Sequence, residues 1–257
     1  MMLNDKTVAA YTAILREELL LATGCTEPIA VAYCAAKLRE VLGGKPEEVL
    51  AEVSGNILKN VKSVVVPNTD GRRGIDAAIA VGIVAGDADA ELQVIANVTE
   101  DDAAAIQGYL DATPIKVTCP ETPCLLDIFL HGKREGHTAA VRVANNHTNI
   151  IYIEKDGDIL LEKPVTANAE DNLQDKSVLN VKDILTFAET VPLSTIEPII
   201  GRQIACNTAI AEEGLKNSWG ANIGSTLLQR SDDIETQARA WAAAGSDARM
   251  NGCEMPV

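Results

Sequence analysis

Residues 24–44, GCTEPIAVAYCAAKLREVLGG, are the stretch from which the first part of the fold follows. Proline is favoured in the first turn of a helix, and glycine is favoured just after the last turn. The pattern therefore predicts a helix over residues 29–41, with Pro28 in its first turn and Thr26 as its N-cap. Residues 7–22 repeat apolar side chains at helical spacing, so a first helix precedes this one.

Cys25 lies between these two predicted helices, at the start of the second. Free backbone N–H groups and the positive end of a helix dipole stabilise a thiolate, which is the form that attacks electrophiles and binds metals. A single cysteine beside a glycine is also commonly a small, buried and unreactive residue. Spacing alone leaves both interpretations of Cys25 open.

The composition is that of an ordinary globular protein. The chain has 257 residues, of which 47% are hydrophobic and 23% are charged, so it can bury one substantial core or two small ones. Its net charge of −15 repels phosphate backbones and anionic lipid headgroups, and we expect no nucleic-acid partner. The longest apolar run, residues 75–85, is too short to span a bilayer, so we expect no membrane association.

The six cysteines are scattered along a chain whose beginning has no signal-peptide pattern. This distribution favours a reducing cytoplasm and argues against a disulfide framework.

Residues 48–164 are predicted to form an α+β domain, a sheet that carries helices on one face. Asp156 and Gly157 indicate a hairpin turn, and residues 75–86 and 99–110 indicate helices. The predicted strands are residues 49–53, 61–66, 92–98, 115–119, 125–130, 138–143, 148–154 and 159–162.

Residues 165–257 are predicted to be a helical region that is incomplete. Residues 164–177 have no apolar periodicity and indicate a linker or mobile loop. The predicted helices that follow are residues 181–190, residues 194–217 opened by a capping box at Ser194, and residues 233–244.

The predicted fold class is therefore α+β, with an N-terminal helix pair over residues 1–47 that packs with the C-terminal helices. The sheet-and-helix layer is inserted between them.

Residues 67–74 connect a predicted strand to the start of a helix, where backbone N–H groups gather around anions. Arg72 and Arg73 in this loop suit a substrate carboxylate. They equally suit a solvated surface that offsets the acidic charge of the chain. Both interpretations remain open from the loop alone.

Two further groups of residues have a possible chemical role. His147 lies in an asparagine-rich turn, where it is our candidate for a proton carrier, although such turns are usually structural. Cys119 and Cys124 have His131 and His137 nearby, which leaves a zinc site open. Zinc and cluster sites use tighter cysteine pairs, so two loop cysteines at strand ends is the preferred interpretation.

Four separated motifs occur in a fixed order: ATGCTEP at residues 22–28, SGNILKN at 54–60, VPNT at 66–69 and AGSDARM at 244–250. Together they resemble the serine dehydratase alpha-chain-like family, which includes L-cysteine desulfidases. The resemblance extends from about Leu15 to the last residue.

This resemblance implies an oxygen-sensitive lyase with a [4Fe-4S] cluster, for which Cys25 is a ligand. It implies β-elimination from L-cysteine, giving pyruvate, ammonia and sulfide, or from L-serine, giving pyruvate and ammonia. An iron with an open position then acts as a Lewis acid on the thiol or hydroxyl of the substrate. The substrate-binding residues that the resemblance implies are Thr26, Glu27, Asn56, Lys59, Asn60, Thr69 and Arg72.

The other cluster ligands implied by the resemblance are not in this chain, since such clusters take three or four cysteines. We therefore expect a second chain or a C-terminal segment to supply them, and a homo-oligomer is a further expectation. The alternative is a non-catalytic amino-acid-binding or assembly module of such an enzyme.

Overall fold

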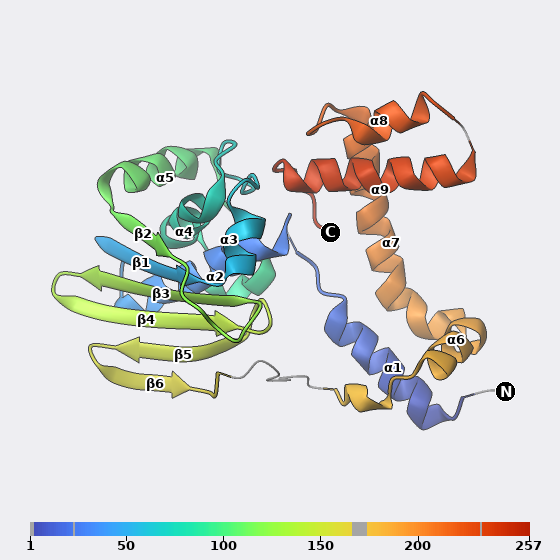
Figure 1. The fold of residues 1–257 in the computed structure, drawn as a ribbon, viewed down its shortest axis with the longest axis horizontal. Coiled ribbons are helices and arrows are strands. Elements are labelled where there is room, and N and C mark those ends of the chain that lie inside the picture. Colours follow the sequence, from blue (N-terminus) through green and yellow to red (C-terminus); the bar gives the residue numbers. More distant parts are fainter. Residues whose placement is uncertain (1–2, 23, 166–173, 232) are drawn as a thin grey trace.

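The computed structural model describes residues 3–22, 24–165, 174–231 and 233–257. Within these residues the fold is α+β, as predicted, with a six-stranded mixed sheet, helices packed on it and a separate group of helices (Figure 1). None of the helices in these ranges is both long enough and apolar enough to cross a membrane.

The sheet has the strand order β2-β1-β3-β4-β5-β6, in which β1 pairs with β2 in parallel and the other pairs are antiparallel. The turn between β5 and β6 has φ of 54° at Asp156 and 88° at Gly157, which confirms the predicted hairpin. The strands are β1 Glu48–Val53, β2 Ile115–Thr118, β3 Asp127–Arg134, β4 His137–Ala144, β5 Ile150–Lys155 and β6 Asp158–Glu162.

The helices fall into two groups along the chain. The helices of the sheet layer are α2 Thr26–Leu42, α3 Gly55–Val61, α4 Gly74–Ala85, η1 Ala88–Gln93 and α5 Glu100–Ala112. Those that form the separate helical region are α1 Asp5–Glu18, η2 Lys176–Val178, α6 Val181–Thr190, α7 Leu193–Lys216, α8 Ile223–Leu228 and α9 Ile234–Met250.

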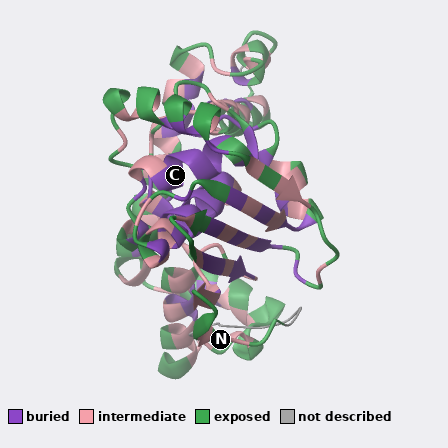
Figure 2. Ribbon diagram, turned by 90° about the vertical axis from the view of Figure 1, so that its left-hand side faces the viewer, coloured by how far each residue is buried: buried purple, intermediate pink, exposed green. Residues whose placement is uncertain are grey.

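Helix α2 is the centre of the hydrophobic core. It packs on β3 and β4 with one side and on α4 with another, and residues 28–36 are buried throughout. The contact with α4 is close: a Cβ atom added to Gly82 would lie 2.2 Å from the carbonyl oxygen of Ala32. Figure 2 shows buried residues gathered in the middle of the molecule and exposed residues towards its two ends.

The sheet exposes one of its faces more than the other, as the predicted one-sided layer requires. Along β3, Ile128 and Leu130 are buried on the side that α2 covers. Phe129 and His131 alternate with them and are only partly buried, with their ring centroids 4.1 Å apart.

The helical region has a sparse core by comparison. Helix α9 packs on α7 and α8 through small residues, and a Cβ atom added to Gly214 would lie 2.1 Å from the carbonyl oxygen of Ala244. The rings of Tyr11 in α1 and Phe187 in α6 are 5.5 Å apart. Large apolar side chains in this region that remain exposed include Val181, Ile184, Leu185, Leu193, Ile204, Ile223, Ile234 and Trp241.

The two N-terminal helices have different neighbours. As predicted, α1 packs with the C-terminal helices, where it contacts α7 and η2. In contrast, α2 packs inside the sheet layer. The difference follows from the sequence, because α2 is apolar on nearly every side and must be covered all round, whereas α1 has only one apolar stripe.

Two predicted strands are wrong. Residues 61–66 contain the end of α3 and a single bridge between Val65 and Arg73, and residues 92–98 contain the end of η1 followed by turns. Short apolar runs of this length do not distinguish a strand from other buried segments. The segment that we expected to connect strands, residues 54–60, instead forms most of α3, and the Ser54 hydroxyl accepts a hydrogen bond from the Ile57 N–H at 3.4 Å.

Two predicted helix starts are displaced. The N-cap of α2 is Cys25 rather than Thr26, and α7 starts at Leu193 with Pro192 as its N-cap, so the capping box at Ser194 does not form. The predicted linker over residues 164–177 lies largely on residues 166–173, which are outside the described residues.

The Gly82 contact gives a test of the core. We expect Gly82→Ala to lower the free energy of unfolding by about 1–3 kcal/mol, because the new methyl group has to push α2 and α4 apart. The matched control is Gly108→Ala in α5, where no atom lies within 4 Å of the added Cβ and the helix gains about 0.5–1 kcal/mol. Urea unfolding of both variants checks this, and equal midpoints for the two would contradict the close contact.

Candidate functional site

A polar cavity of about 480 Å³ lies where the start of α2, the helix α3 and the end of α9 meet. In Figure 1 the end of α9 points towards α3, across the boundary between the sheet layer and the helical region. The cavity is lined by Cys25, Glu27, Lys59, Asn60, Ser63, Val64, Arg73, Arg249, Met250 and Asn251. Its walls therefore come from both ends of the sequence.

Backbone contacts hold the end of α9 in this place. The Val65 N–H donates to the Met250 carbonyl oxygen at 3.3 Å. Nearby, Ala22 and Val257 exchange two backbone hydrogen bonds of 3.1 and 3.0 Å. Gly24 has φ of 77°, and a Cβ atom there would lie 2.7 Å from Cγ of Pro67, so the loop before α2 also needs a glycine.

Glu27 is the centre of the hydrogen bonds in the cavity. Its Oε2 accepts from the Cys25 thiol at 3.2 Å and from the Thr26 hydroxyl at 3.3 Å, and its Oε1 accepts from the Asn60 side-chain amide at 3.1 Å. Burial opposes ionisation of Glu27, but hydrogen bonds from Cys25 and from its own backbone N–H outweigh it and lower its pKa. The cavity therefore holds a carboxylate at neutral pH.

The prediction of a Cys25 thiolate is wrong for the chain by itself. Burial raises the pKa of the Cys25 thiol to about 11, and the neighbouring Glu27 carboxylate raises it further than the Arg249 guanidinium lowers it. The thiol is 9% exposed, lines the cavity and donates to Glu27, so it is protonated at neutral pH. As the N-cap of α2, Cys25 makes no capping hydrogen bond with its side chain.

His147, the candidate proton carrier, lies on the connection between β4 and β5 and interacts electrostatically with Glu27. Burial lowers the pKa of His147, and the Glu27 carboxylate opposes this shift only in part. The imidazole is therefore neutral at pH 7 and can accept a proton. In the same turn, the buried amide nitrogen Nδ2 of Asn145 has no hydrogen-bond partner among the described residues.

The structure brings four of the predicted site residues into the cavity, namely Cys25, Glu27, Lys59 and Asn60. Thr26 reaches the same network through its hydrogen bond to Glu27. The Asn56 side chain lies one helical turn before Asn60 on α3 and is not part of the cavity lining.

Thr69 and Arg72 have structural contacts instead. Thr69 is fully buried, and its hydroxyl donates to the Val66 carbonyl oxygen at 2.7 Å. Arg72 donates to the Thr69 carbonyl oxygen and, at 2.9 Å, to Oε1 of Gln107 in α5. Their polar groups thus hold the loop before α4 in its conformation and attach it to α5. Neither residue lines the cavity.

The sequence analysis missed Arg249 and Asn251 as cavity residues. Of the two loop arginines that it named, Arg73 lines the cavity, whereas Arg72, which the family resemblance implied, does not. Arg249 belongs to the AGSDARM motif, so that motif could have identified it. Nothing in the sequence indicated that the end of α9 lies beside the start of α2. The Arg73 guanidinium donates to the Ser63 carbonyl oxygen at 2.7 Å.

The described residues do not fit a whole iron–sulfur cluster. Cys25 is the one cysteine in the lining of the cavity, whereas such a cluster takes three or four thiolates. Among the described residues, no group of three or more His, Cys, Asp and Glu side chains is arranged to hold a metal ion. Cys25 therefore fits as a single ligand at most.

The zinc alternative is not supported by the positions of its residues. Cys119 is exposed, whereas Cys124 is buried in a small cluster with Ala144 and Ile151. The nearby histidines have carboxylate partners, Glu52 at 3.1 Å for His131 and Asp156 at 2.9 Å for His137.

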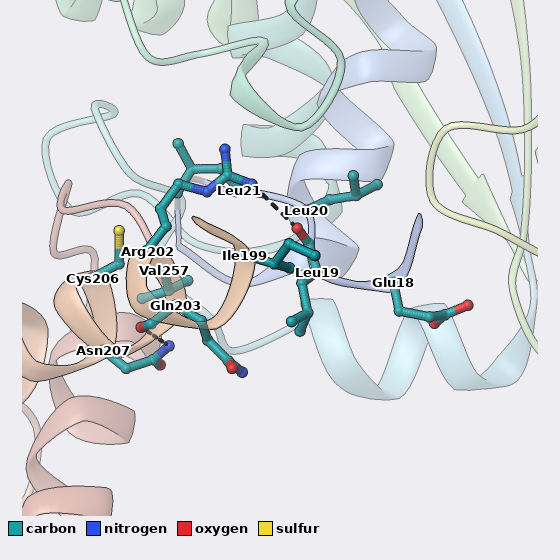
Figure 3. Close-up of a pocket in the computed structure, with 10 residues that line it drawn as sticks. All are labelled: Glu18, Leu19, Leu20, Leu21, Ile199, Arg202, Gln203, Cys206, Asn207 and Val257. Carbon is teal, nitrogen blue, oxygen red and sulfur yellow. Dashed lines mark hydrogen bonds between the residues drawn. The ribbon is translucent and has the colours of Figure 1, made fainter. Parts of the chain in front are cut away.

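A second, smaller cavity of about 110 Å³ lies between the segment after α1 and the face of α7 (Figure 3). The Arg202 guanidinium donates to the Leu19 carbonyl oxygen at 3.4 Å across it, and Cys206 lies at one side. Its volume is well below that of the polar cavity, and its acidic and basic residues, Glu18 and Arg202, are exposed. A cavity between α7 and α9 has a volume similar to that of the polar cavity, about 490 Å³, but contains none of the predicted site residues. We consider the polar cavity the candidate site because Cys25, Glu27, Lys59 and Asn60 line it.

Comparison with known proteins finds similarity to UPF0597 proteins of several bacteria. The protein of Treponema denticola is 45% identical over 100% of this chain and 61% of its own length. Those of Desulfitobacterium hafniense and Lachnoclostridium phytofermentans are each 46% identical, over 99% and 95% of this chain and 59% and 58% of their own lengths. No family model and no solved structure matches the chain. The chain thus spans about three fifths of the length of these curated relatives.

The protonated Cys25 can be tested by alkylation with iodoacetamide and mass spectrometry of the modified peptides. Because the pKa of Cys25 is raised to about 11, we expect its labelling to be slow at neutral pH and to rise with a midpoint near that value. Glu27→Gln removes the repelling carboxylate and is expected to shift the midpoint to lower pH. Exposed Cys119 is the internal reference, and labelling of Cys25 as fast as that of Cys119 at neutral pH would contradict this assignment.

Proposed function

We propose that this chain forms the amino-acid-binding part of an iron–sulfur-dependent lyase that carries out β-elimination on L-cysteine or L-serine. The observation that carries the proposal is the convergence of motifs on the polar cavity. Cys25 and Glu27 of the first motif, Lys59 and Asn60 of the second and Arg249 of the fourth line it together. Residues from three of the four motifs that resemble the serine dehydratase alpha-chain-like family thus lie in one cavity, and this supports a shared role for them.

The chemistry of the lining suits an amino acid. The ionised Glu27 accepts hydrogen bonds, which an ammonium group supplies, and the Asn60 amide nitrogen already donates one to it. In this proposal, the substrate ammonium binds at Glu27, and the neutral His147 takes up the proton removed from the substrate. The electrostatic coupling between His147 and Glu27 supports their membership of the same site.

In the same proposal Cys25 is the one cluster ligand that this chain contributes. The other ligands come from a second chain or from a further C-terminal segment, as expected from the resemblance, and the greater length of the curated relatives is compatible with either source. Binding of iron by Cys25 requires loss of the thiol proton, which the raised pKa opposes until the metal is present. A reducing cytoplasm is the compartment that we propose, since it protects both thiols and clusters.

A non-catalytic amino-acid-binding or assembly module is the second candidate. It is favoured by two observations: the cavity has a single thiol, and the helical region leaves many large apolar side chains exposed. Exposed apolar surface of this kind is typical of contacts with other protein segments.

Binding measurements separate the two candidates. We expect L-cysteine and L-serine to bind the chain in isothermal titration calorimetry, and Glu27→Gln to weaken both by about tenfold or more, because the ammonium loses its charged partner. Cys25→Ala is expected to weaken binding in the lyase proposal, whereas binding that ignores this substitution favours the module. Cys206→Ala, in the smaller cavity, is the matched control and is expected to leave both affinities unchanged.

The single-ligand assignment makes a second prediction. After anaerobic reconstitution with iron and sulfide, we expect this chain alone to remain colourless and to release no sulfide from L-cysteine, because one thiol does not hold a [4Fe-4S] cluster. Absorbance spectroscopy and a sulfide assay check both parts. A brown protein that releases sulfide would show that the chain contains enough ligands by itself.

A further inference from the structure

Arg249 is the cavity residue whose polar contacts are incomplete. It lies in the last turn of α9 and lines the polar cavity beside Cys25, Met250 and Asn251, and it also borders a cavity between α7 and α9. Its side chain is partly buried, and it is close enough to Cys25 for the two to interact electrostatically. The guanidinium is therefore held at the wall of the cavity and not out in solvent.

The nitrogen Nε of Arg249 is buried and has no hydrogen-bond partner in the part of the chain that the structure describes. In the partly buried Arg142, by contrast, Nε donates to Oδ1 of Asp127 at 2.8 Å, and a terminal guanidinium nitrogen donates to Oδ2 at 2.6 Å. A buried charged donor without a partner is costly, and in native proteins such a group commonly has a functional role, of which binding a ligand is one.

The charges around Arg249 point to the sign of that ligand. The cavity lining contains three cationic side chains, Lys59, Arg73 and Arg249, against the one carboxylate of Glu27. This excess of positive charge lies in a chain whose net charge is −15. A pocket with an excess of cationic side chains attracts a small anion, and the Glu27 carboxylate remains as the partner for an ammonium group.

We infer that Arg249 is the anchor for the carboxylate of the ligand that occupies this cavity. The planar guanidinium presents N–H donors in a fork that matches the two oxygens of a carboxylate, and Nε takes part in that fork. Glu27 and Asn60 lie on other elements of the same cavity, so a molecule with both an ammonium and a carboxylate satisfies both ends. The inference rests on the cavity of the proposed function and names the group that gives it specificity.

The test uses three ligands that share a thiol and differ in their charged groups. L-cysteine has the ammonium and the carboxylate, 3-mercaptopropionate lacks the ammonium, and cysteamine lacks the carboxylate. Calorimetric titration of the full chain is expected to show that Arg249→Met weakens the first two ligands by about ten- to a hundredfold and leaves cysteamine unchanged. Arg249→Lys, which keeps the charge but loses the fork, is expected to lie between wild type and Arg249→Met.

Two controls guard the interpretation. Arg239→Met changes an exposed arginine of the same helix, paired with Glu235, and is expected to leave all three affinities unchanged. Arg249→Met keeps an apolar stem and removes an unsatisfied buried donor, so its melting temperature without ligand is expected to equal or exceed that of wild type. In wild type, 3-mercaptopropionate is expected to raise the melting temperature, and this rise is expected to be absent in Arg249→Met.

The outcomes distinguish this inference from the proposed function. Equal binding of 3-mercaptopropionate by wild type and Arg249→Met, or no binding by either, overturns the carboxylate anchor. A marked fall in the melting temperature of Arg249→Met with unchanged ligand affinities also overturns it, because the residue is then structural. If binding of 3-mercaptopropionate depends on Arg249 while L-cysteine binding ignores Glu27 and Cys25, the anchor stands and the lyase proposal fails.

Discussion

The structure depends on the burial of the middle of α2, where residues 28–36 are all buried. A helix that is apolar on nearly every side is stable only if other elements cover it all round, and here the sheet covers one side while α4 packs closely on another. The absence of a side chain at Gly82 permits the closest approach. Because α2 is fixed in this way, its first turn is fixed as well, and the first turn presents Cys25 and Glu27 to the cavity.

The parts of the fold that the sequence predicts well are those with a local signal. Alternating apolar residues and the Asp156–Gly157 turn predict β4 to β6 closely, and the long apolar run predicts α4. The strand predicted over residues 125–130 is displaced, because β3 is Asp127–Arg134. Residues 61–66 and 92–98 have the composition of strands but no alternation that fixes a register. Their burial comes from tertiary contacts, such as the hydrogen bond from the Asn68 amide to the Ile95 carbonyl oxygen, and these have no signature in the local sequence.

The candidate site shows the same division. Cys25, Glu27, Lys59 and Asn60 were predicted from motifs, and they meet because α3 contacts α2. Thr69 and Arg72 belong to a motif of the same resemblance, yet their polar groups close a turn. A motif identifies residues that a structure needs but does not say whether they bind a ligand or hold the backbone.

The paired backbone hydrogen bonds between Ala22 and Val257 have a consequence for the cavity. Ala22 belongs to the large core of the sheet layer and Val257 follows α9, so these bonds join the helical region to the sheet layer. Val257 packs against the small core of the helical region, so these two bonds form a seam between two parts that have separate cores. A ligand that contacts both α3 and α9 binds only while the seam is closed. Its binding therefore stabilises the closed seam, and a closed seam in turn strengthens its binding.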